Sequence, residues 1–323
     1  MIDLYPFLHY GSIAFIVALT SLGVGIGGGK ASMQAVCAIN IAPLSYPSIF
    51  RALIISLALI ETSAILGIVM ALFLILGPTN AIQADQQLYV TIAEWGIAFA
   101  LGISGALVGI LSSLPAQQAF FALARQPFFA TKILNALLIT QSIVQTPVIF
   151  SFLIALFIKA QLISATSLAN SIRLLASGIC IGFGTIGPTF GLARFARVCQ
   201  ESIAYNKNAY KLIMPFTFIS QAIIETPIIF AVLISIVLLL IPIKPPHEFV
   251  GAISCVAAAL CAALGTFGPG ISSGTIAGSA CREIAKQPEQ HSVLSRTSIL
   301  GQGIIDAAAM YALLIALLII ILK

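Results

Sequence analysis

Hydrophobic positions along the chain gather into long, uninterrupted runs that are separated by short polar breaks. The runs lie at about 12–40, 48–76, 93–122, 131–158, 169–199, 212–241, 250–283 and 295–322. Each run exceeds the roughly 20 residues with which a helix crosses a bilayer. The runs are continuous, whereas membrane strands alternate apolar and polar residues. The pattern therefore predicts an all-α membrane protein with eight transmembrane helices.

The breaks between the runs alternate in kind. Short polar turns with basic flanks follow the odd-numbered runs, and looser linkers follow the even-numbered ones. We therefore expect four tandem helical hairpins, at 1–80, 81–163, 164–244 and 245–323. Most basic residues flank the tight turns, so the positive-inside rule predicts cytoplasmic turns and termini on the outer side.

Glycine follows the same division. All of the 25 glycines lie in odd-numbered runs or at their edges, except Gly67, Gly77, Gly301 and Gly303. In lipid, small residues let helix backbones approach closely. The odd-numbered helices are thus predicted to pack tightly together, as on the inner wall of a ring. Packing inside a monomeric eight-helix bundle is the alternative.

Composition narrows the class of protein. Only 8% of the 323 residues are charged, whereas a soluble domain carries about 25%. A soluble enzyme and a disordered chain are therefore excluded. The net charge of +5 is scattered along the sequence, so no nucleic acid is expected as a partner. Lipid is the expected surrounding of the apolar runs.

Three acidic residues lie in the middle of even-numbered runs: Glu61, Glu225 and Asp306. The other seven, Glu94 among them, lie at the ends of runs or in the links. A charge at the bilayer centre costs at least about 2.5–3.5 kcal/mol, so such residues are interpreted first as functional. The alternative is a protonated acid that makes a structural hydrogen bond inside a helix bundle.

One polar group recurs at the same place in every hairpin. It stands 18 residues after the start of each tight turn, in the pairs Pro43 and Glu61, Pro127 and Gln145, Lys207 and Glu225, and Pro288 and Asp306. Independent packing accidents would not keep this register. The repeat therefore predicts four equivalent positions at one depth, three of which carry a carboxyl group.

The fourth hairpin shows the full set of motifs. It contains Gly268-Pro-Gly-Ile-Ser-Ser-Gly274, then Ala285-Lys-Gln-Pro-Glu289, then Asp306, and the second hairpin keeps Ala124-Arg-Gln-Pro127. In this combination the chain resembles the proteolipid c subunit of rotary ATP synthases and ATPases, once per hairpin. The resemblance implies a membrane rotor ring built from copies of the chain.

The resemblance also implies a mechanism and partners. A mid-membrane carboxyl would take one ion at the stator a subunit, whose arginine favours the ionised form, and the ring would turn. The tight turns would seat the central-stalk subunits, through Arg125, Gln126, Pro127, Lys286, Gln287 and Pro288. Anchoring by positive charge alone is the other interpretation of these turns.

The transported ion is expected to be H⁺, with Na⁺ as the alternative. Sodium sites of the family add a glutamine in the first helix, and its place here is held by Gly28, Ser112, Leu192 and Ser273. Hydroxyl groups stand beside two acids, as Thr62 and Thr226, so Na⁺ remains possible at Glu61 and Glu225.

Two prolines bear on the same question. Pro227 cannot donate to the carbonyl group of Ile223, which is thereby freed as a further ligand, and Pro147 frees that of Ile143. A simple kink in each helix is the alternative. No cofactor and no other metal is expected.

Gln145 and Lys30 depart from the family pattern. A glutamine cannot titrate, so the second hairpin is expected to carry no ion, giving three ions per four hairpins; drift that the ring tolerates is the alternative. Lys30 would either pair with Glu61 and hold it ionised, or extend toward the turn.

No GxxxxGK[ST] motif occurs, so the chain is expected to be a non-catalytic subunit. The bacterial plasma membrane is the expected location, with an organelle membrane left open. The rival function is an eight-helix secondary transporter or channel with buried acids, which would require two symmetric halves.

Overall fold

The computed structural model describes residues 4–77, 86–241, 243 and 248–322. Within these residues every regular element is a helix, and eight helical spans are long and apolar enough to cross a membrane. The prediction of an all-α protein with eight such helices is therefore confirmed. The spans are Tyr5–Ile41, Pro43–Ile75, Gln87–Arg125, Pro127–Ala160, Leu168–Tyr205, Lys207–Leu240, Glu248–Lys286 and Pro288–Ile321.

The spans pair into hairpins. The first holds α1 (Leu4–Ile41), η1 (Pro43–Ser45) and α2 (Tyr46–Ile75). The second holds α3 (Gln87–Leu111), α4 (Ser113–Arg125), η4 (Pro127–Phe129), α5 (Ala130–Val144) and α6 (Thr146–Ala160). The third holds α7 (Leu168–Gly184), α8 (Ile186–Tyr205), η6 (Lys207–Ala209) and α9 (Tyr210–Leu240). The fourth holds α10 (Glu248–Gly265), α11 (Phe267–Lys286), η7 (Pro288–Gln290) and α12 (His291–Ile321).

Proline explains where the spans are interrupted. The breaks fall at Ser112, Gln145, Thr185 and Thr266, and a proline follows each by two or three residues: Pro115, Pro147, Pro188 and Pro269. Proline has no N–H to donate and crowds the carbonyl four residues back. The direction of the span is kept through each break, so the interruption is a local adjustment of one crossing helix.

Each tight turn is a single 3-10 turn. Proline begins it in three hairpins, at Pro43, Pro127 and Pro288, where a fixed φ favours the first position of a helical turn. The third hairpin begins with Lys207, and there the side chain of Asn206 accepts a hydrogen bond from the Asn208 N–H instead. The same turn is therefore built from two different sequences.

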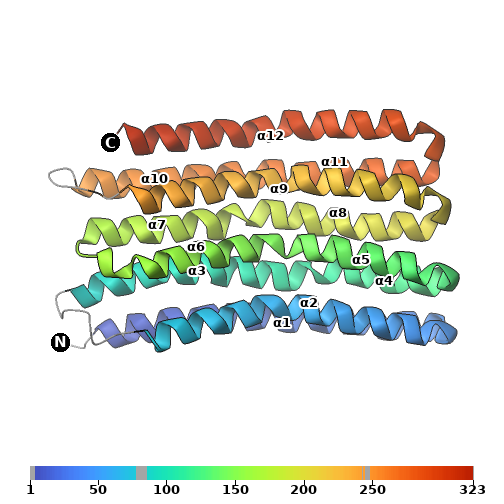
Figure 1. Cartoon of the computed structure of the whole chain (residues 1–323), viewed down its shortest axis with the longest axis horizontal. Coiled ribbons are helices and arrows are strands. Elements are labelled where there is room, and N and C mark those ends of the chain that lie inside the picture. Colours follow the sequence, from blue (N-terminus) through green and yellow to red (C-terminus); the bar gives the residue numbers. More distant parts are fainter. Residues whose placement is uncertain (1–3, 78–85, 242, 244–247, 323) are drawn as a thin grey trace.

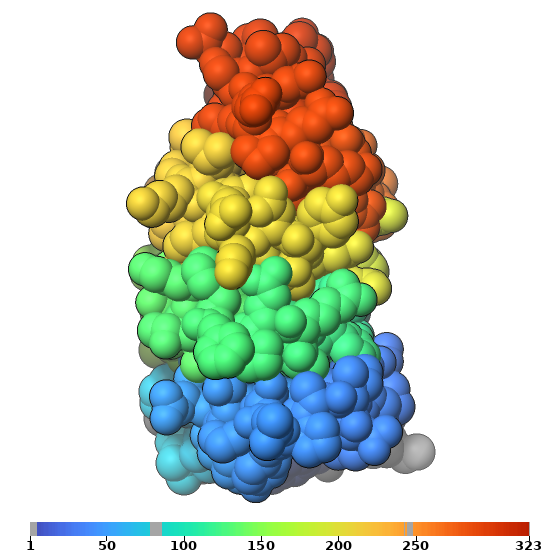
Figure 2. Space-filling view, turned by 90° about the vertical axis from the view of Figure 1, so that its right-hand side faces the viewer, coloured from blue at the N-terminus to red at the C-terminus, as the bar shows by residue number. Residues whose placement is uncertain are grey.

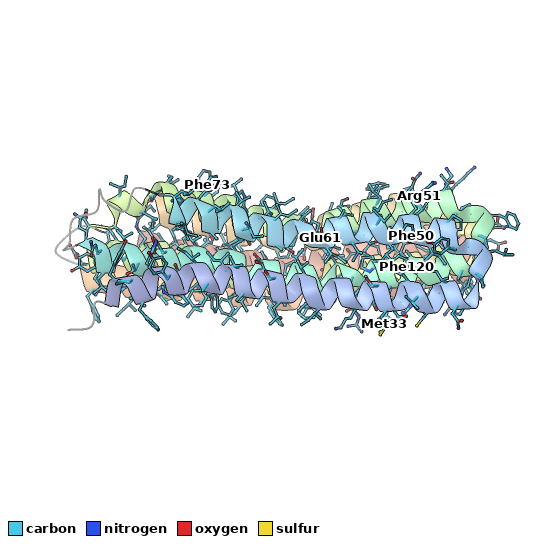
Figure 3. All side chains as sticks on the ribbon, turned by 90° about the horizontal axis from the view of Figure 1, so that it is seen from below. Met33, Phe50, Arg51, Glu61, Phe73 and Phe120 are labelled. Atoms are coloured by element: carbon cyan, nitrogen blue, oxygen red, sulfur yellow. The ribbon has the colours of Figure 1, made fainter. Side chains whose placement is uncertain are left out.

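The hairpins lie side by side in chain order (Figures 1 and 2), so the first and the last stand at opposite ends. The first helices of successive hairpins pack against one another: α1 on α3, α3 on α7, α4 on α8, and α8 on α11. The second helices, α2, α5 and α6, α9, and α12, form the other row, and Figure 3 shows α1 and α2 in these two layers.

Glycine sets the spacing of the first row, as the sequence predicts. A Cβ atom on Gly109 would lie 2.8 Å from the backbone of Gly23, and one on Gly96 would lie 2.9 Å from the backbone of Leu175. Real Cβ atoms do not approach backbone this closely. The first helices therefore touch through their backbones, as close helix packing in lipid requires.

Two of the three expected boundaries between hairpins, after 80 and after 244, lie outside the described residues. The third, after 163, falls within η5 (Leu162–Ser164), which joins α6 to α7.

Candidate functional site

The four repeat positions lie halfway along the second row of helices. Glu61 lies in α2, Glu225 in α9 and Asp306 in α12, and Gln145 stands at the break between α5 and α6. Figure 3 shows Glu61 midway between Phe73 at one end of α2 and Arg51 near the tight turn. Their burial differs: Gln145 is 4% exposed, Asp306 is 7% exposed, Glu225 is half-buried and Glu61 is exposed.

Glu225 is bonded to the preceding hairpin. Its carboxyl group is hydrogen-bonded to the hydroxyl of Thr146, and that hydroxyl also lies 2.8 Å from the carbonyl oxygen of Ile143. A hydroxyl group has one proton to donate. When Thr146 donates it to Ile143, Glu225 must be the donor in the other bond. The arrangement therefore fits a protonated Glu225.

Gln145 occupies the same arrangement one hairpin earlier. Its side-chain oxygen lies 3.0 Å from the Thr62 hydroxyl, which lies 2.7 Å from the carbonyl oxygen of Leu59. The amide nitrogen has no partner among the described residues. With the amide turned over, that nitrogen donates to Thr62, and Thr62 donates to Leu59. Gln145 thus offers the same donor as a protonated glutamate.

In two hairpins the threonine that follows the repeat position bonds the next hairpin's position rather than its own. Thr62 bonds Gln145 rather than Glu61, and Thr226 bonds the carbonyl oxygen of Ala222 at 3.3 Å. Adjacent residues project about 100° apart around a helix, so the threonine side chain points to the neighbouring helix. Our expectation that Thr62 and Thr226 would serve Glu61 and Glu225 is corrected, and Thr146 is a site residue that it missed.

Asp306 has a different partner. The Ser273 hydroxyl, from α11 of the same hairpin, donates to its carboxyl group at 3.3 Å. The equivalent residues elsewhere do not bond their repeat positions: Ser112 bonds the Gly109 carbonyl at 3.4 Å, and Leu192 is fully buried and apolar. Gly28 faces Leu57, whose side chain would lie 3.4 Å from an added Cβ atom.

A glutamine one turn before three of the positions ties each hairpin to the one before. Gln141 donates to the carbonyl oxygen of Ser56 at 3.1 Å, and Gln221 donates to that of Thr140 at 3.4 Å. Gln302 donates to the hydroxyl of Ser220 at 3.4 Å. These bonds join the second-row helices of adjacent hairpins one turn from the repeat positions.

Lys30 and the two prolines were the further features expected to act around the acids. Lys30 is exposed, and among the described residues the three ion pairs are His9–Glu94, Arg282–Glu201 and Lys286–Glu283, so Lys30 does not pair with Glu61. The carbonyl oxygen of Ile143 is occupied by the Thr146 hydroxyl. Ile223 lies in the unbroken helix α9, which passes through Pro227.

The tight turns form a polar surface at one end of the molecule. Gln126 donates to the carbonyl oxygen of Ala204 in the next hairpin at 2.6 Å, and Asn206 donates to that of Ala285 at 2.9 Å. A hollow of about 520 Å³ lies between the second and third turns. Its described lining is Arg125, Gln126, Pro127, Phe128, Phe129, Tyr205, Asn206, Lys207 and Asn208. In the fourth turn, Lys286 pairs with Glu283 at 2.7 Å. Gln287 is exposed there, and Pro288 is half-buried.

The sequence analysis did not reveal a buried hydrogen bond between a histidine and a glutamate. His9 Nδ1 of α1 lies 2.8 Å from Glu94 Oε2 of α3, and both side chains are 5% exposed. Glu94 was expected at the end of a span, yet it lies two turns inside α3. The partners are 85 residues apart, so no local pattern reveals the contact. It joins the first two hairpins near the end opposite the tight turns.

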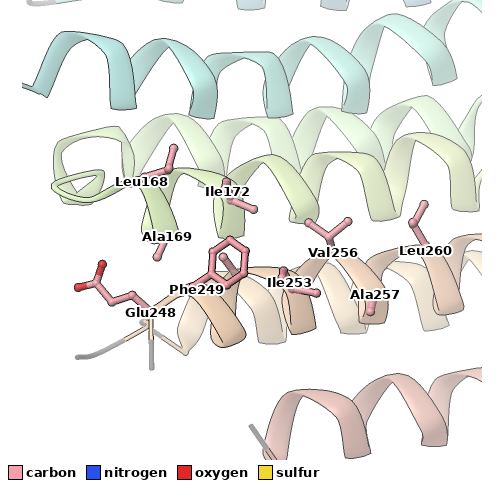
Figure 4. A pocket seen from close by; sticks show the side chains of 10 residues that line it. Leu168, Ala169, Ile172, Glu248, Phe249, Ile253, Val256, Ala257 and Leu260 are labelled. Atoms are coloured by element: carbon pink, nitrogen blue, oxygen red, sulfur yellow. The ribbon is translucent and has the colours of Figure 1, made fainter. Parts of the chain in front are cut away.

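A second hollow, of about 540 Å³, lies between α7 and α10 (Figure 4). Leu168, Ile172, Phe249 and Ile253 line it, and Glu248 stands at its edge. Among the described residues of its lining only Glu248 is ionisable, so this hollow is an apolar groove rather than an ion site. No group of three or more His, Cys, Asp or Glu gathers in the described part of the chain.

These observations define an integral membrane protein made of repeated helical hairpins, with a polar residue at the centre of each second helix. The sequence profile of the ATP synthase C-subunit family matches residues 12–74, 175–238 and 256–319, which together make up more than half of the chain. The chain belongs to this family of ion-translocating rotor proteins. Each match spans one hairpin, so the chain is a fused, multi-hairpin form.

Proposed function

We propose that this chain is a rotor-ring subunit that carries H⁺ on Glu61, Glu225 and Asp306, three ions for every four hairpins. The observation that supports it best is the repeat itself: three carboxyl groups at the midpoint of a membrane span, 164 and 81 residues apart in one register, in a member of the c-subunit family. The chain then has no ATP chemistry of its own. That chemistry belongs to the other subunits.

H⁺ accounts for the contacts of the sites better than Na⁺. Sodium requires several oxygen ligands around the acid, whereas Asp306 has one hydroxyl partner and is followed by Ala307 and Ala308. At Glu225, a carboxyl proton supplies the donor for the second hydrogen bond of the Thr146 hydroxyl, whose own proton goes to the Ile143 carbonyl oxygen. Gln145, whose uncharged amide stands at the same place beside the Thr62 hydroxyl, fits a position that is permanently neutral.

The partners follow from the family and from the two surfaces. Copies of the chain complete a ring, the stator a subunit with its arginine faces the second row of helices, and lipid covers the rest. The tight turns, with their hollow and the exposed Phe128, meet the central-stalk subunits. The basic flanks of these turns support a cytoplasmic position for them, with the termini outside. The membrane that we propose is the bacterial plasma membrane.

Labelling with dicyclohexylcarbodiimide tests this proposal, because the reagent attacks protonated carboxyl groups in apolar surroundings. The full chain in its native membrane is treated at fixed pH with and without Na⁺, and labelled peptides are identified by mass spectrometry. We expect labels on Glu61, Glu225 and Asp306 that Na⁺ does not reduce. Protection by Na⁺ would overturn the assignment of H⁺, and the absence of label at all three would overturn the rotor function.

A further inference from the structure

A small polar hollow lies between α8 and α11, two neighbouring helices of the first row. Its volume is about 80 Å³, several times the space that one water molecule needs. Arg194 of α8 and Arg282 of α11 both line it, and Gly274 and Gly278 leave room for it because they have no side chains. Its described lining belongs to the first row alone, so the hollow is separate from the repeat positions.

The hollow opens on the face of the first row that is turned away from the second row. Figure 3 shows Met33 of α1 pointing away from α2. In the register that equates Gly28 with Leu192, Met33 corresponds to Arg197 of α8. Arg194 stands three residues before Arg197, on the same side of the helix, and both residues are exposed.

The two arginines stand on either side of the boundary between hydrocarbon and headgroups. Arg194 precedes the turn at Lys207 by roughly 20 Å of helix, Arg282 precedes the turn at Pro288 by roughly 9 Å, and Glu225 follows Lys207 by roughly 27 Å. With the level of Glu225 at the centre of a hydrocarbon core about 30 Å thick, Arg194 begins about 8 Å inside the core and Arg282 about 3 Å outside it. The phosphate groups of lipids lie next to this boundary.

The hollow carries one positive charge without a partner. Arg282 donates to Glu201 at 3.1 Å, which balances its charge. Among the described residues, none of the three ion pairs includes Arg194. A charge in the hydrocarbon region is costly unless it meets a counter-charge or extends to the interface. The planar N–H groups of arginine match the oxygens of a phosphate group two at a time.

This arrangement is confined to the boundary between the third and fourth hairpins. At the same register, the first boundary has Lys30 and Phe121, and the second has Leu114 and Glu201. Neither of these pairs brings two basic residues together. The repeat alone therefore does not account for the two arginines.

Apolar side chains continue the same face toward the middle of the membrane. Phe190 and Phe183 precede Arg194 by four and eleven residues, which places them on its side of the span. They are 40% and 37% exposed. The face thus offers a cationic hollow at the headgroup boundary and an apolar surface below it, as an anionic lipid requires.

We propose that this hollow binds the phosphate group of an anionic phospholipid from the leaflet on the side of the tight turns. Arg194 and Arg282 donate to the phosphate oxygens, and the acyl chains lie along Phe190 and Phe183. A soluble phosphate ion would have to enter a face that lies within a membrane span, whereas a lipid already carries its phosphate to this depth. Lipid binding here is independent of which ion the acids carry.

Native mass spectrometry of the full chain, purified in mild detergent, tests the site. The probe is phosphatidylglycerol, and the number of bound lipids per chain is followed as its concentration rises. We expect Arg194→Gln to weaken binding of one lipid about tenfold, which is the effect of one charge-assisted hydrogen bond. The matched control is Arg197→Gln, which removes an exposed arginine of the same helix that does not line the hollow. Equal losses in the two variants would show general attraction by positive charge and would overturn the site.

Two further comparisons fix the place and the ligand. Ser279 is exposed and lines the hollow, so Ser279→Leu should block it and weaken binding as Arg194→Gln does, with every charge retained. Phosphatidylcholine, which has no net charge, should bind more weakly than phosphatidylglycerol and should not respond to Arg194→Gln. Equal binding of the two lipids, or unchanged binding in Ser279→Leu, would contradict the proposal. Displacement of the lipid by excess inorganic phosphate would show a site for the free ion and would overturn the assignment to lipid.

Discussion

At the scale of single residues, Gln145 and Glu225 make the same kind of contact with the preceding hairpin. In both positions a threonine of the preceding hairpin stands between the polar group and a backbone carbonyl. Its single proton lets it accept one hydrogen bond and donate another. A glutamine amide and a protonated carboxyl group both supply the bond that it accepts. Under the proposed function, Gln145 thereby keeps the packing of an ion site without a group that can change its charge.

The role of this threonine is testable at Glu225. Thr146→Ala removes the acceptor of the carboxyl proton. That proton can then pass to a carbodiimide nitrogen without first breaking a hydrogen bond, so labelling of Glu225 should become about fivefold faster. Thr226→Ala is the matched control, since that hydroxyl bonds Ala222 of its own helix. Unchanged labelling after Thr146→Ala, or an equal effect of both changes, would show that the threonine does not hold the proton.

The sequence predicted which residues carry the polar positions, and among the residues that contact them it identified Ser273 beside Asp306 but not Thr146 beside Glu225. Equal spacing from the tight turns identifies Glu61, Gln145, Glu225 and Asp306, because a straight helix converts residue number into depth at 1.5 Å per residue. Contacts between hairpins depend on how helices are rotated against one another. Sequence neighbours therefore suggested Thr226 for Glu225, where the structure has Thr146.

At the scale of helices, glycine decides how closely the first row packs. Gly191 of α8 faces Gly270 of α11, and a Cβ atom there would collide with the Gly270 carbonyl group. The backbone cannot yield as a flexible side chain can. The alternation of glycine-rich and bulky runs made this row predictable from the sequence, whereas the breaks at Ser112, Thr185 and Thr266 depend on prolines inside runs that are otherwise continuous and apolar.

Gly191→Ala should therefore destabilise the fold by about 1–3 kcal/mol, as overpacking of a close interface does. The expected result is a lower thermal unfolding temperature of the purified chain in detergent. Gly278→Ala is the matched control in α11, because its added Cβ atom would lie 3.5 Å from the side chain of Val198, an ordinary contact. Equal unfolding temperatures for the two variants would contradict backbone contact between α8 and α11.

At the scale of the whole molecule, fusion makes the hairpins unequal. Four copies of a separate hairpin would be identical, whereas here each boundary has its own residues, and the burial of the four central positions ranges from Gln145 at 4% exposed to the exposed Glu61. The His9–Glu94 pair occurs at the first boundary, and Arg282–Glu201 at the third. The overall row of hairpins was predictable from the repeat, but these individual pairs were not, since each joins residues more than 80 positions apart.

The most direct test of three carriers per chain is the number of ions moved per ATP in the intact rotary complex after Gln145→Glu. This change restores a carboxyl group at the fourth position and raises the number of carriers from three to four per chain. We expect a rise of the ion-to-ATP ratio in that proportion, measured as ion uptake into vesicles against ATP hydrolysed. Gln145→Asn is the control, which should leave the ratio at its original value. An unchanged ratio in a Gln145→Glu complex that still pumps would contradict the assignment of Gln145 as the idle position among four.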